Sequence, residues 1–506
     1  MRLRRLTART AAAASAVLLL ATASLTTASG APRAGGPAFS AAPLATWQTN
    51  GTVWSIASAH GVVYVGGTFD KVRPPGARPG EKEVERRSFA AFDAVSGELL
   101  PCTHFFNGGE ATVRAMKASP DGKVLYVGGS FGKVDGKGVA NTVAIDTAGC
   151  TLRDDFRPEV AAIVRAVDVT KDTVYLGGDF TRVDGRRRSH IAAFTRAGRL
   201  LPFQATLDQP VRAVLAAPDY GKVLVGGDFD TANGAPQHAL VALDPATGAT
   251  VFSYPGWIPP RSRVKALARE GSVFYLGAEG EGGGAFDGRL ANPLADDRML
   301  WRDFCYGATQ AVVPYKGVLY SAAHAHDCSQ TPGGFPEHGK MWHLLAQSAT
   351  DETLFHWYPD TDGGLGEGVG PRALGVAAGV LWAGGEFTRV NGVPQQSLTR
   401  FAATGDAPVE EPPALSLDGV RDGRVTFGWW ATWDRDDAVL TYSVYRDGKR
   451  VGSMKRRSAP WDRPWMTYTD TVAPGSRHRY TVTVGDGTGA TVKSRPLTVT
   501  AAAGTR

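Results

Sequence analysis

Short apolar runs followed by a pair of glycines recur along the chain. The copy at residues 63–69 reads Val-Tyr-Val-Gly-Gly-Thr-Phe, and four more copies keep its pattern, at 125–131, 174–180, 223–229 and 381–387. Two degenerate copies stand at 274–279 and 319–324. Short apolar runs bounded by glycine are typical of buried strands. No long stretch shows helical periodicity, so the pattern predicts an all-β fold.

The spacing of these copies indicates a repeat architecture. The first glycine position falls at 66, 128, 177, 226, 277, 322 and 384, so one unit spans 45 to 62 residues. Propeller blades occupy roughly 40–50 residues. In four copies Asp-Gly or Asn-Gly follows the Phe, as in Asp135-Gly136, and these pairs favour hairpin turns. We therefore predict a seven-bladed β-propeller over residues 44–404, closed to protect its sheet edges.

The N-terminal segment is predicted to complete the ring. The last copy ends at Phe401 without an outermost strand. The segment from Trp47 to Val53 precedes the first copy and resembles that missing strand. We expect it to pair with the final blade.

A second domain follows a Pro-rich acidic linker at residues 405–413. Beyond the linker, Val425, Phe427 and Trp429 alternate as one face of a strand, and further strands end in turns such as Asp447-Gly448. Residues 414–501 are therefore predicted to form a β-sandwich of immunoglobulin-like size.

Both regions resemble known families. The repeat, with its glycine pair, Phe and following Val-Asp/Asn-Gly, resembles the delta-sixty repeat β-propellers of secreted actinobacterial proteins. Residues 415–500 resemble a fibronectin type III domain, through Val425-x-Phe427-x-Trp429 and the strand at 480–484. The resemblance implies the fold and export, and it implies no settled activity. Fibronectin type III modules of secreted bacterial proteins often accompany polysaccharide-active enzymes, so the resemblance adds a glycan role to the expected functions.

The N-terminus has the pattern of a secretory signal. Arginines including Arg4 and Arg5 precede an apolar stretch at 11–23, and small residues near Gly30 suit cleavage. We expect a signal peptide at 1–30, a flexible segment at 31–43, no membrane span and a secreted, extracellular, monomeric protein. The whole chain has a formal charge of +6. The predicted signal contains four arginines and no acidic residue, so the remaining chain carries 6 − 4 = +2. The nearly neutral mature chain excludes the concentrated basic footprint of nucleic-acid binding.

The cysteines are expected to form disulfides, because an exported chain meets an oxidising compartment. Four cysteines allow three connectivities. We favour Cys102–Cys150 and Cys305–Cys328, because each pair falls in identical or neighbouring repeats.

The polar position after the glycine pair is the first candidate site. Around the predicted ring this position holds Thr68, Ser130, Asp179, Asp228, Glu279, His324 and Glu386. Equivalent residues of a propeller lie on one circle about its axis, so the acids and the histidine could line a cation or sugar site. Alternatively, each side chain caps its own turn. Ser130 also matches Gly-x-Ser-x-Gly, but its place in the repeat explains this match and a serine hydrolase is rejected.

Histidines and tryptophans supply further candidates. His324 and His326 project to the same face of one predicted strand, as metal ligands can. A divalent cation at these two histidines is the one cofactor that the sequence suggests, and no other cofactor is expected. In the basic sandwich, Trp461 and Trp465 lie near several Lys and Arg side chains and could stack on sugars. Alternatively, they pack against the propeller.

Three functions remain open at this stage. The leading hypothesis is a non-catalytic binding or scaffold protein, whose partner is a cell-wall or extracellular polysaccharide or a surface protein. The first alternative is a glycoside hydrolase or lyase that uses Asp179, Asp228 or Glu386 as acid and base, which requires two carboxyl groups about 5–9.5 Å apart. The second is a metal-dependent enzyme at His324 and His326.

Overall fold

The computed structural model describes residues 36–296, 298–488 and 490–502, and these belong to one compact unit. The predicted signal peptide and the start of the flexible segment lie outside the described residues. The described chain is built from short antiparallel strands, with one 3₁₀ turn at Pro218–Tyr220. None of its helical segments is long and apolar enough to cross a membrane.

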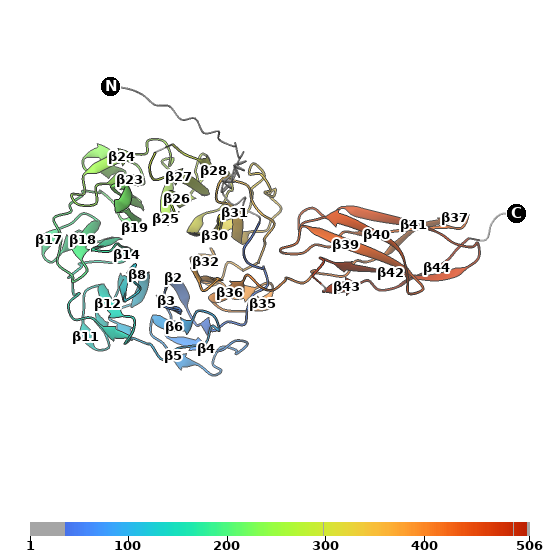
Figure 1. The fold of residues 1–506 in the computed structure, drawn as a ribbon, viewed down its shortest axis with the longest axis horizontal. Helices are drawn as coiled ribbons and strands as arrows, with labels where there is room; N and C mark the ends of the chain where they lie inside the picture. Colours follow the sequence, from blue (N-terminus) through green and yellow to red (C-terminus); the bar gives the residue numbers. More distant parts are fainter. Residues whose placement is uncertain (1–35, 297, 489, 503–506) are drawn as a thin grey trace, which may run out of the picture. The chain divides into compact units, whose positions relative to one another are not determined.

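Seven antiparallel sheets of three or four strands follow one another in the described part of the chain (Figure 1). The first sheet contains β2(Thr52–Ala59), β3(Val62–Thr68) and β6(Phe89–Asp93). The second contains β8(Thr112–Ala118), β9(Val124–Ser130), β12(Thr142–Asp146) and β13(Thr151–Leu152). The third contains β14(Val164–Val169), β15(Thr173–Gly178) and β18(Ile191–Thr195). The fourth sheet contains β19(Val211–Ala217), β20(Lys222–Gly227), β23(Leu240–Leu243) and β24(Thr250–Ser253). The fifth contains β25(Ser262–Glu270), β26(Val273–Gly280), β27(Arg289–Pro293) and β28(Trp301–Arg302). The sixth sheet contains β29(Thr309–Tyr315), β30(Val318–Ala325) and β31(Trp342–Ser348). The seventh contains β32(Pro371–Ala377), β33(Val380–Gly385) and β36(Leu398–Ala402). Each repeated glycine pair lies on the second strand of its sheet, and the arrangement is propeller-like.

The first glycine of each pair permits close packing between consecutive sheets. A Cβ placed on Gly177 would collide with the side chain of Val211 in the next sheet. The same relation joins Gly128 to Val164, and it joins Gly384 of the last sheet to Val53 of the first. Because the last sheet packs on the first in this way, the succession of sheets closes on itself.

The N-terminal segment pairs with the last sheet, but through residues other than those expected. Ser40 and Leu44 donate backbone hydrogen bonds to Ala402 and Arg400 of β36, at 2.9 and 2.8 Å. The expected segment, Trp47 to Val53, instead contributes β1(Gln48–Thr49), which pairs with β4(Lys71–Arg73), and then enters β2. The pairing segment therefore lies a few residues upstream of the predicted one.

Small hairpins follow the second strands of several sheets. They are formed by β10(Lys133–Val134) with β11(Lys137–Gly138), β16(Arg182–Val183) with β17(Arg186–Arg187), β21(Thr231–Ala232) with β22(Ala235–Pro236), and β34(Arg389–Val390) with β35(Val393–Pro394). Two further short strands are β5(Val84–Glu85), which pairs with β4, and β7(Phe106–Asn107), which pairs with β10. Asp135 and Gly136 both have positive φ, at 49° and 79°, which confirms the hairpin turn predicted at this Asp-Gly pair.

Both expected disulfides are present, Cys102–Cys150 and Cys305–Cys328. The first crosses from the loop after β6 to the loop after β12, so it joins the first two sheets. The second ties the connection between the fifth and sixth sheets, which contains Cys305, to the loop that follows β30, which contains Cys328.

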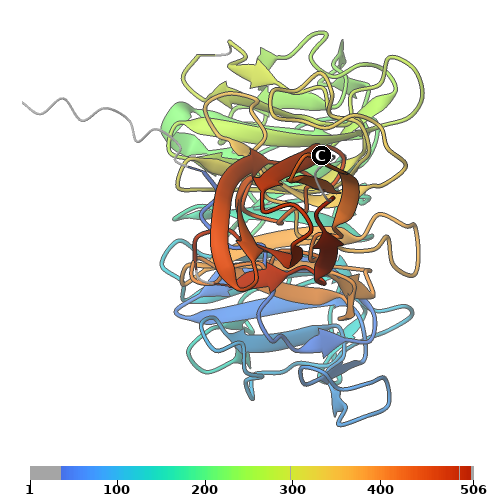
Figure 2. The same cartoon turned by 90° about the vertical axis from the view of Figure 1, so that its right-hand side faces the viewer.

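Two further sheets pack face to face over the C-terminal residues (Figure 2). One contains β37(Ser416–Arg421), β38(Arg424–Trp430) and β41(Trp465–Thr471). The other contains β39(Val439–Arg446), β40(Lys449–Arg457), β42(Arg477–Gly485), β43(Thr491–Lys493) and β44(Leu497–Thr500). The predicted alternation of Val425, Phe427 and Trp429 is confirmed, because all three side chains are buried between the sheets. Linker residue Val409 joins this core.

Candidate functional site

Each innermost strand of the seven sheets carries a β-bulge at the same point. In β14 the register shifts between Val164 and Ala166, so Arg165 has no partner across the ladder. A bulge re-aims the side chain of the extra residue. The residues at the seven bulges are Trp54, Arg114, Arg165, Arg212, Lys265, Gln310 and Arg372.

These seven side chains line one pocket of about 410 Å³, together with Glu367. Because each comes from a different innermost strand, the pocket lies where the seven strands converge, and we call it the axial pocket. Four arginines and one lysine lie in its wall, against one glutamate. The pocket therefore presents mainly hydrogen-bond donors and positive charge.

The acids of the predicted polar position stand beside these cations. Arg165 donates to both oxygens of Asp179, at 2.5 and 2.7 Å, and Arg212 donates to Asp228 at 2.8 and 2.5 Å. On the fifth sheet, Lys265 lies 3.1 Å from Glu279. Each of these carboxylates thus holds a cation of its own sheet in place.

The last sheet repeats the arrangement with a more buried acid. Arg372 donates to Glu386 at 3.1 Å and to Glu367 at 2.8 Å. Glu386 is only 6% exposed and also accepts backbone N–H groups from Glu367 and Val369. Part of this acid's role is therefore to cap the loop before β32, beside the pocket, and not the turn that follows its own strand.

Arg114 differs from the other cations of the axial pocket. Its sheet has Ser130 at the polar position, and within the described residues Arg114 forms no ion pair with a carboxylate. Its guanidinium stacks on Trp54 at 3.8 Å from the ring centroid, and its Nε has no hydrogen-bond partner. Burial, together with the nearby Arg165 and Arg372, lowers the pKa of Arg114 to about 10. An incoming anion would relieve this repulsion.

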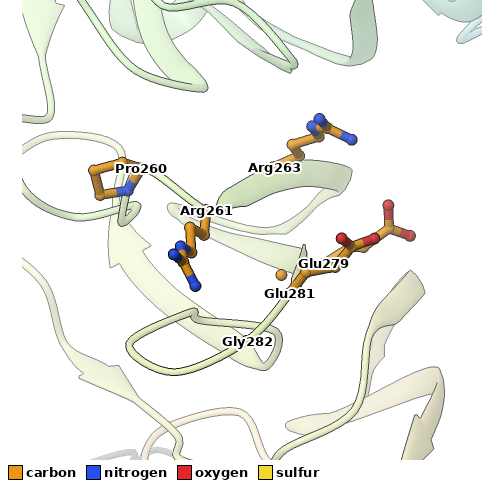
Figure 3. Close-up of a pocket in the computed structure, with 7 residues that line it drawn as sticks. Pro260, Arg261, Arg263, Glu279, Glu281 and Gly282 are labelled. Carbon is orange, nitrogen blue, oxygen red and sulfur yellow. The ribbon is translucent and has the colours of Figure 1, made fainter.

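A second hollow of about 570 Å³ adjoins the fifth sheet (Figure 3). Arg261 and Arg263 line it, and Glu279 borders both this hollow and, through Lys265, the axial pocket. Burial raises the pKa of Glu279, but Lys265 and Gln310 outweigh this effect and leave the pKa below its usual value. Glu279 is therefore an ionised residue that orders its polar neighbours.

The sixth sheet brings histidines near the pocket without bringing them together as a metal site. His324 is partly buried, its Nδ1 has no partner, and burial followed by the charge of His326 lowers its pKa. His326 pairs instead with Glu337 at 2.5 Å, on an exposed loop. Over residues 36–296, 298–488 and 490–502, the only group of three clustered potential ligands is a set of aspartates elsewhere.

The two candidate tryptophans occupy different surroundings. Trp461 packs against Phe335 and Tyr358 of the sixth-sheet region, with ring centroids 5.0 and 4.9 Å away. Trp465 is 38% exposed and forms an edge-to-face pair with Trp430, which is 58% exposed. Of the two candidates, Trp465 is the one that, with Trp430, offers an accessible aromatic surface.

The axial cations themselves were not among the candidates from sequence. A second repeated phrase marks them, apolar-Arg-Ala-apolar, as in Val164-Arg165-Ala166-Val167 and Val211-Arg212-Ala213-Val214. The bulge that turns this Arg toward the axis is the reason that the phrase breaks the two-residue alternation of a strand.

Comparison with known proteins adds little. No protein-family model and no curated protein matches the chain. Similar solved structures include the extracellular domain of a protein described as a hybrid two component system from B. thetaiotaomicron, with 12% identity, 88% of this chain and 77% of that chain covered, and a TM-score of 0.27. Another is Saccharomyces cerevisiae Sqt1, with 11% identity, 78% and 96% covered, and a TM-score of 0.40. Both likenesses are too weak to bear on function.

Proposed function

We propose that this chain is a secreted, non-catalytic binding protein that captures an anionic cell-wall or extracellular polysaccharide in the axial pocket of a seven-bladed propeller. The observation that carries the proposal is the convergence on one pocket of five cationic side chains, each from a different innermost strand. A fibronectin type III domain over residues 414–501 serves as spacer or second adhesion surface.

The fold assignment draws support from the sheets themselves. Seven successive sheets in the described chain each contain one copy of the repeat, and Gly384 packs on Val53 as Gly177 packs on Val211. The two facing sheets at the C-terminus support the fibronectin type III assignment, because they enclose one buried apolar core.

Secretion is supported by two independent features. Disulfides such as Cys102–Cys150 persist in oxidising compartments. The basic and apolar pattern of residues 1–30 is typical of an export signal.

The chemistry of the pocket favours an anion. Guanidinium groups bind carboxylates and phosphates in a planar, two-bonded geometry, which a neutral sugar cannot match. Trp54 adds an aromatic face beside Arg114 and Arg372 for a sugar ring. Uronate carboxylates or the phosphodiesters of a wall polymer have the required combination of ring and charge.

A binding role accounts for the acids better than a hydrolytic one. Glycoside hydrolysis needs one carboxyl as a proton donor and a second one free to act on the sugar or on water. Asp179, Asp228 and Glu386 are each engaged by an arginine. These ion pairs suit the three acids to holding the cations of the pocket in place.

The test is binding of the mature protein to anionic and neutral polysaccharides, measured by calorimetry together with released reducing sugar. We expect binding to the anionic polymers only, no released sugar, and weaker binding as salt rises, because salt screens partly exposed charges. Arg114→Gln should weaken binding about tenfold or more, because it removes a cation without leaving a carboxylate unpaired.

Arg199→Gln is the matched control, since Arg199 is an exposed arginine outside the axial pocket. Equal loss of binding in both variants would refute the axial pocket as the binding site. Sugar release that disappears in Asp179→Asn or Asp228→Asn would overturn the non-catalytic role.

A further inference from the structure

Five aspartates gather at the junction of the linker and the C-terminal sandwich. They are Asp406 of the linker, Asp434, Asp436 and Asp437 of the loop between β38 and β39, and Asp486 after β42. One oxygen each from Asp406, Asp436 and Asp437 lies within 4.8 Å of the other two. The remaining two flank this group, since the Asp434 carboxyl lies within hydrogen-bond reach of Asp436 and the Asp486 carboxyl within reach of Asp406.

No cation of the described chain pairs with these carboxyls. Arg435, which stands among them in sequence, forms its ion pair with Glu410 and donates to the carbonyl of Tyr358. The carboxyls accept neutral donors instead: Asp436 accepts from Ser40 Oγ at 2.8 Å, and Asp406 accepts from Thr488 Oγ1 at 2.6 Å. Such bonds orient the oxygens, but they leave the accumulated negative charge uncompensated.

The burial of Asp434 shows that the cluster is more than a charged surface patch. Asp434 is 0% exposed, and its Oδ1 accepts from the backbone N–H groups of Asp436 and Asp437 at 3.0 and 3.1 Å. Its Oδ2 has no partner, and neither has the buried Oδ2 of Asp486. A buried carboxylate oxygen without a donor is costly unless a proton or a metal ion meets it.

The negative charges of these carboxyls accumulate at one place without a balancing cation among the described residues. A divalent cation would offset them, since it stabilises ionised carboxylates at close range.

We propose that Asp406, Asp436 and Asp437 form a Ca²⁺-binding site, with Asp434 and Asp486 completing its negative shell. The donors are all carboxylate oxygens, which suit a hard cation, and the set lacks the imidazole and thiolate ligands that zinc and copper favour. The carboxylates come from the linker, from one loop and from a third turn, and Ca²⁺ accepts such irregular sets of six to eight oxygens, whereas Mg²⁺ demands near-ideal octahedral geometry.

The site would act as a structural tie. Asp406 belongs to the linker, Asp436 and Asp437 belong to the sandwich, and Asp436 also holds the backbone N–H of Ala41 at 2.6 Å. One ion would therefore fasten the linker and the 40–44 segment to the same loop. This inference does not depend on the function proposed for the axial pocket.

The test is calorimetric titration of the chelator-treated full mature chain with CaCl₂, together with thermal unfolding with and without the ion. We expect about one equivalent of Ca²⁺ to bind with a Kd between roughly 10⁻⁶ and 10⁻³ M, and Tm to rise with Ca²⁺ more than with equal MgCl₂. Absence of both heat and Tm shift at 10-fold above that range, roughly 10 mM, would refute the site.

Asp437→Asn sharpens the test, because Asp437 makes no side-chain hydrogen bond or ion pair in the structure that its loss would break. We expect it to weaken Ca²⁺ affinity at least tenfold while leaving the metal-free protein as stable as the wild type or more so, because one repulsive charge is removed. The control is Asp418→Asn, an exposed aspartate of β37 outside the cluster, which should bind Ca²⁺ normally. Unchanged affinity in Asp437→Asn, or equal loss in Asp418→Asn, would overturn the assignment.

Discussion

At the scale of residues, the recurring unit is an ion pair built from two repeat positions. The bulge supplies the cation and the end of the second strand supplies the acid, as in Arg165–Asp179 and Arg212–Asp228. The two pairs differ in burial: the Asp179 side chain is 25% exposed, whereas that of Asp228 is 8% exposed. A buried acid depends more on its partner, because water cannot replace it.

Arg212→Met should therefore destabilise the fold by about 2 kcal/mol, less than the full penalty for a buried pair because Arg212 is partly exposed and Arg263 lies 3.8 Å from Asp228. Adding Asp228→Asn should recover about half of this loss, since it removes the unpaired charge. Urea unfolding of the single and double variants measures both effects. If Arg165→Met cost as much as Arg212→Met, burial would not be the controlling factor.

At the scale of elements, packing between neighbouring sheets depends on the absence of a side chain. Gly177 faces Val211, and a Cβ at Gly177 would overlap that side chain. Gly177 does not have a positive φ, so the requirement for glycine comes from the neighbouring strand and not from the backbone conformation. The sixth copy has Ala322 at the equivalent position.

Gly177→Ala should cost about 1–3 kcal/mol of unfolding free energy through overpacking. Val211→Ala in the same chain should restore part of it by making room for the new methyl group. The control is Gly138→Ala, because a Cβ at Gly138 meets nothing within 4 Å. A Gly138→Ala variant as unstable as Gly177→Ala would point to a general intolerance of alanine and not to contact between sheets.

At the scale of the whole molecule, covalent and noncovalent ties link parts that are distant in sequence. Cys102 and Cys150 are 48 residues apart and join the first two sheets, while Cys305 and Cys328 are 23 apart. The 40–44 segment closes the ring by pairing with β36.

Replacing Cys102 and Cys150 by Ser should destabilise the protein by about 4 kcal/mol, and replacing Cys305 and Cys328 by about 3 kcal/mol, because the longer loop gains more entropy on unfolding. Thermal unfolding of the two double variants under identical conditions gives the comparison. A larger loss for the shorter loop would show that native packing around the bond outweighs loop entropy.

The sequence by itself determined the strands, the turns, the disulfide pairing and the position of each repeat. These properties are local, or they follow from periodicity, as the hairpin at Asp135-Gly136 and the buried face of Val425, Phe427 and Trp429 show. The polar position after the glycine pair was also visible, with Asp179, Asp228 and Glu386 among its members.

Only the tertiary structure decided what those residues do. A bulge reverses the side to which one residue points, so Arg114 and Arg165 reach the pocket although strand alternation alone does not place them there. The pairing of each acid with a cation, and the meeting of Asp406 with Asp436 and Asp437, both depend on segments that only folding brings together. Electrostatic energy falls off with distance in space and not in sequence, which is why charge could be counted from the sequence but its balance at each site could not.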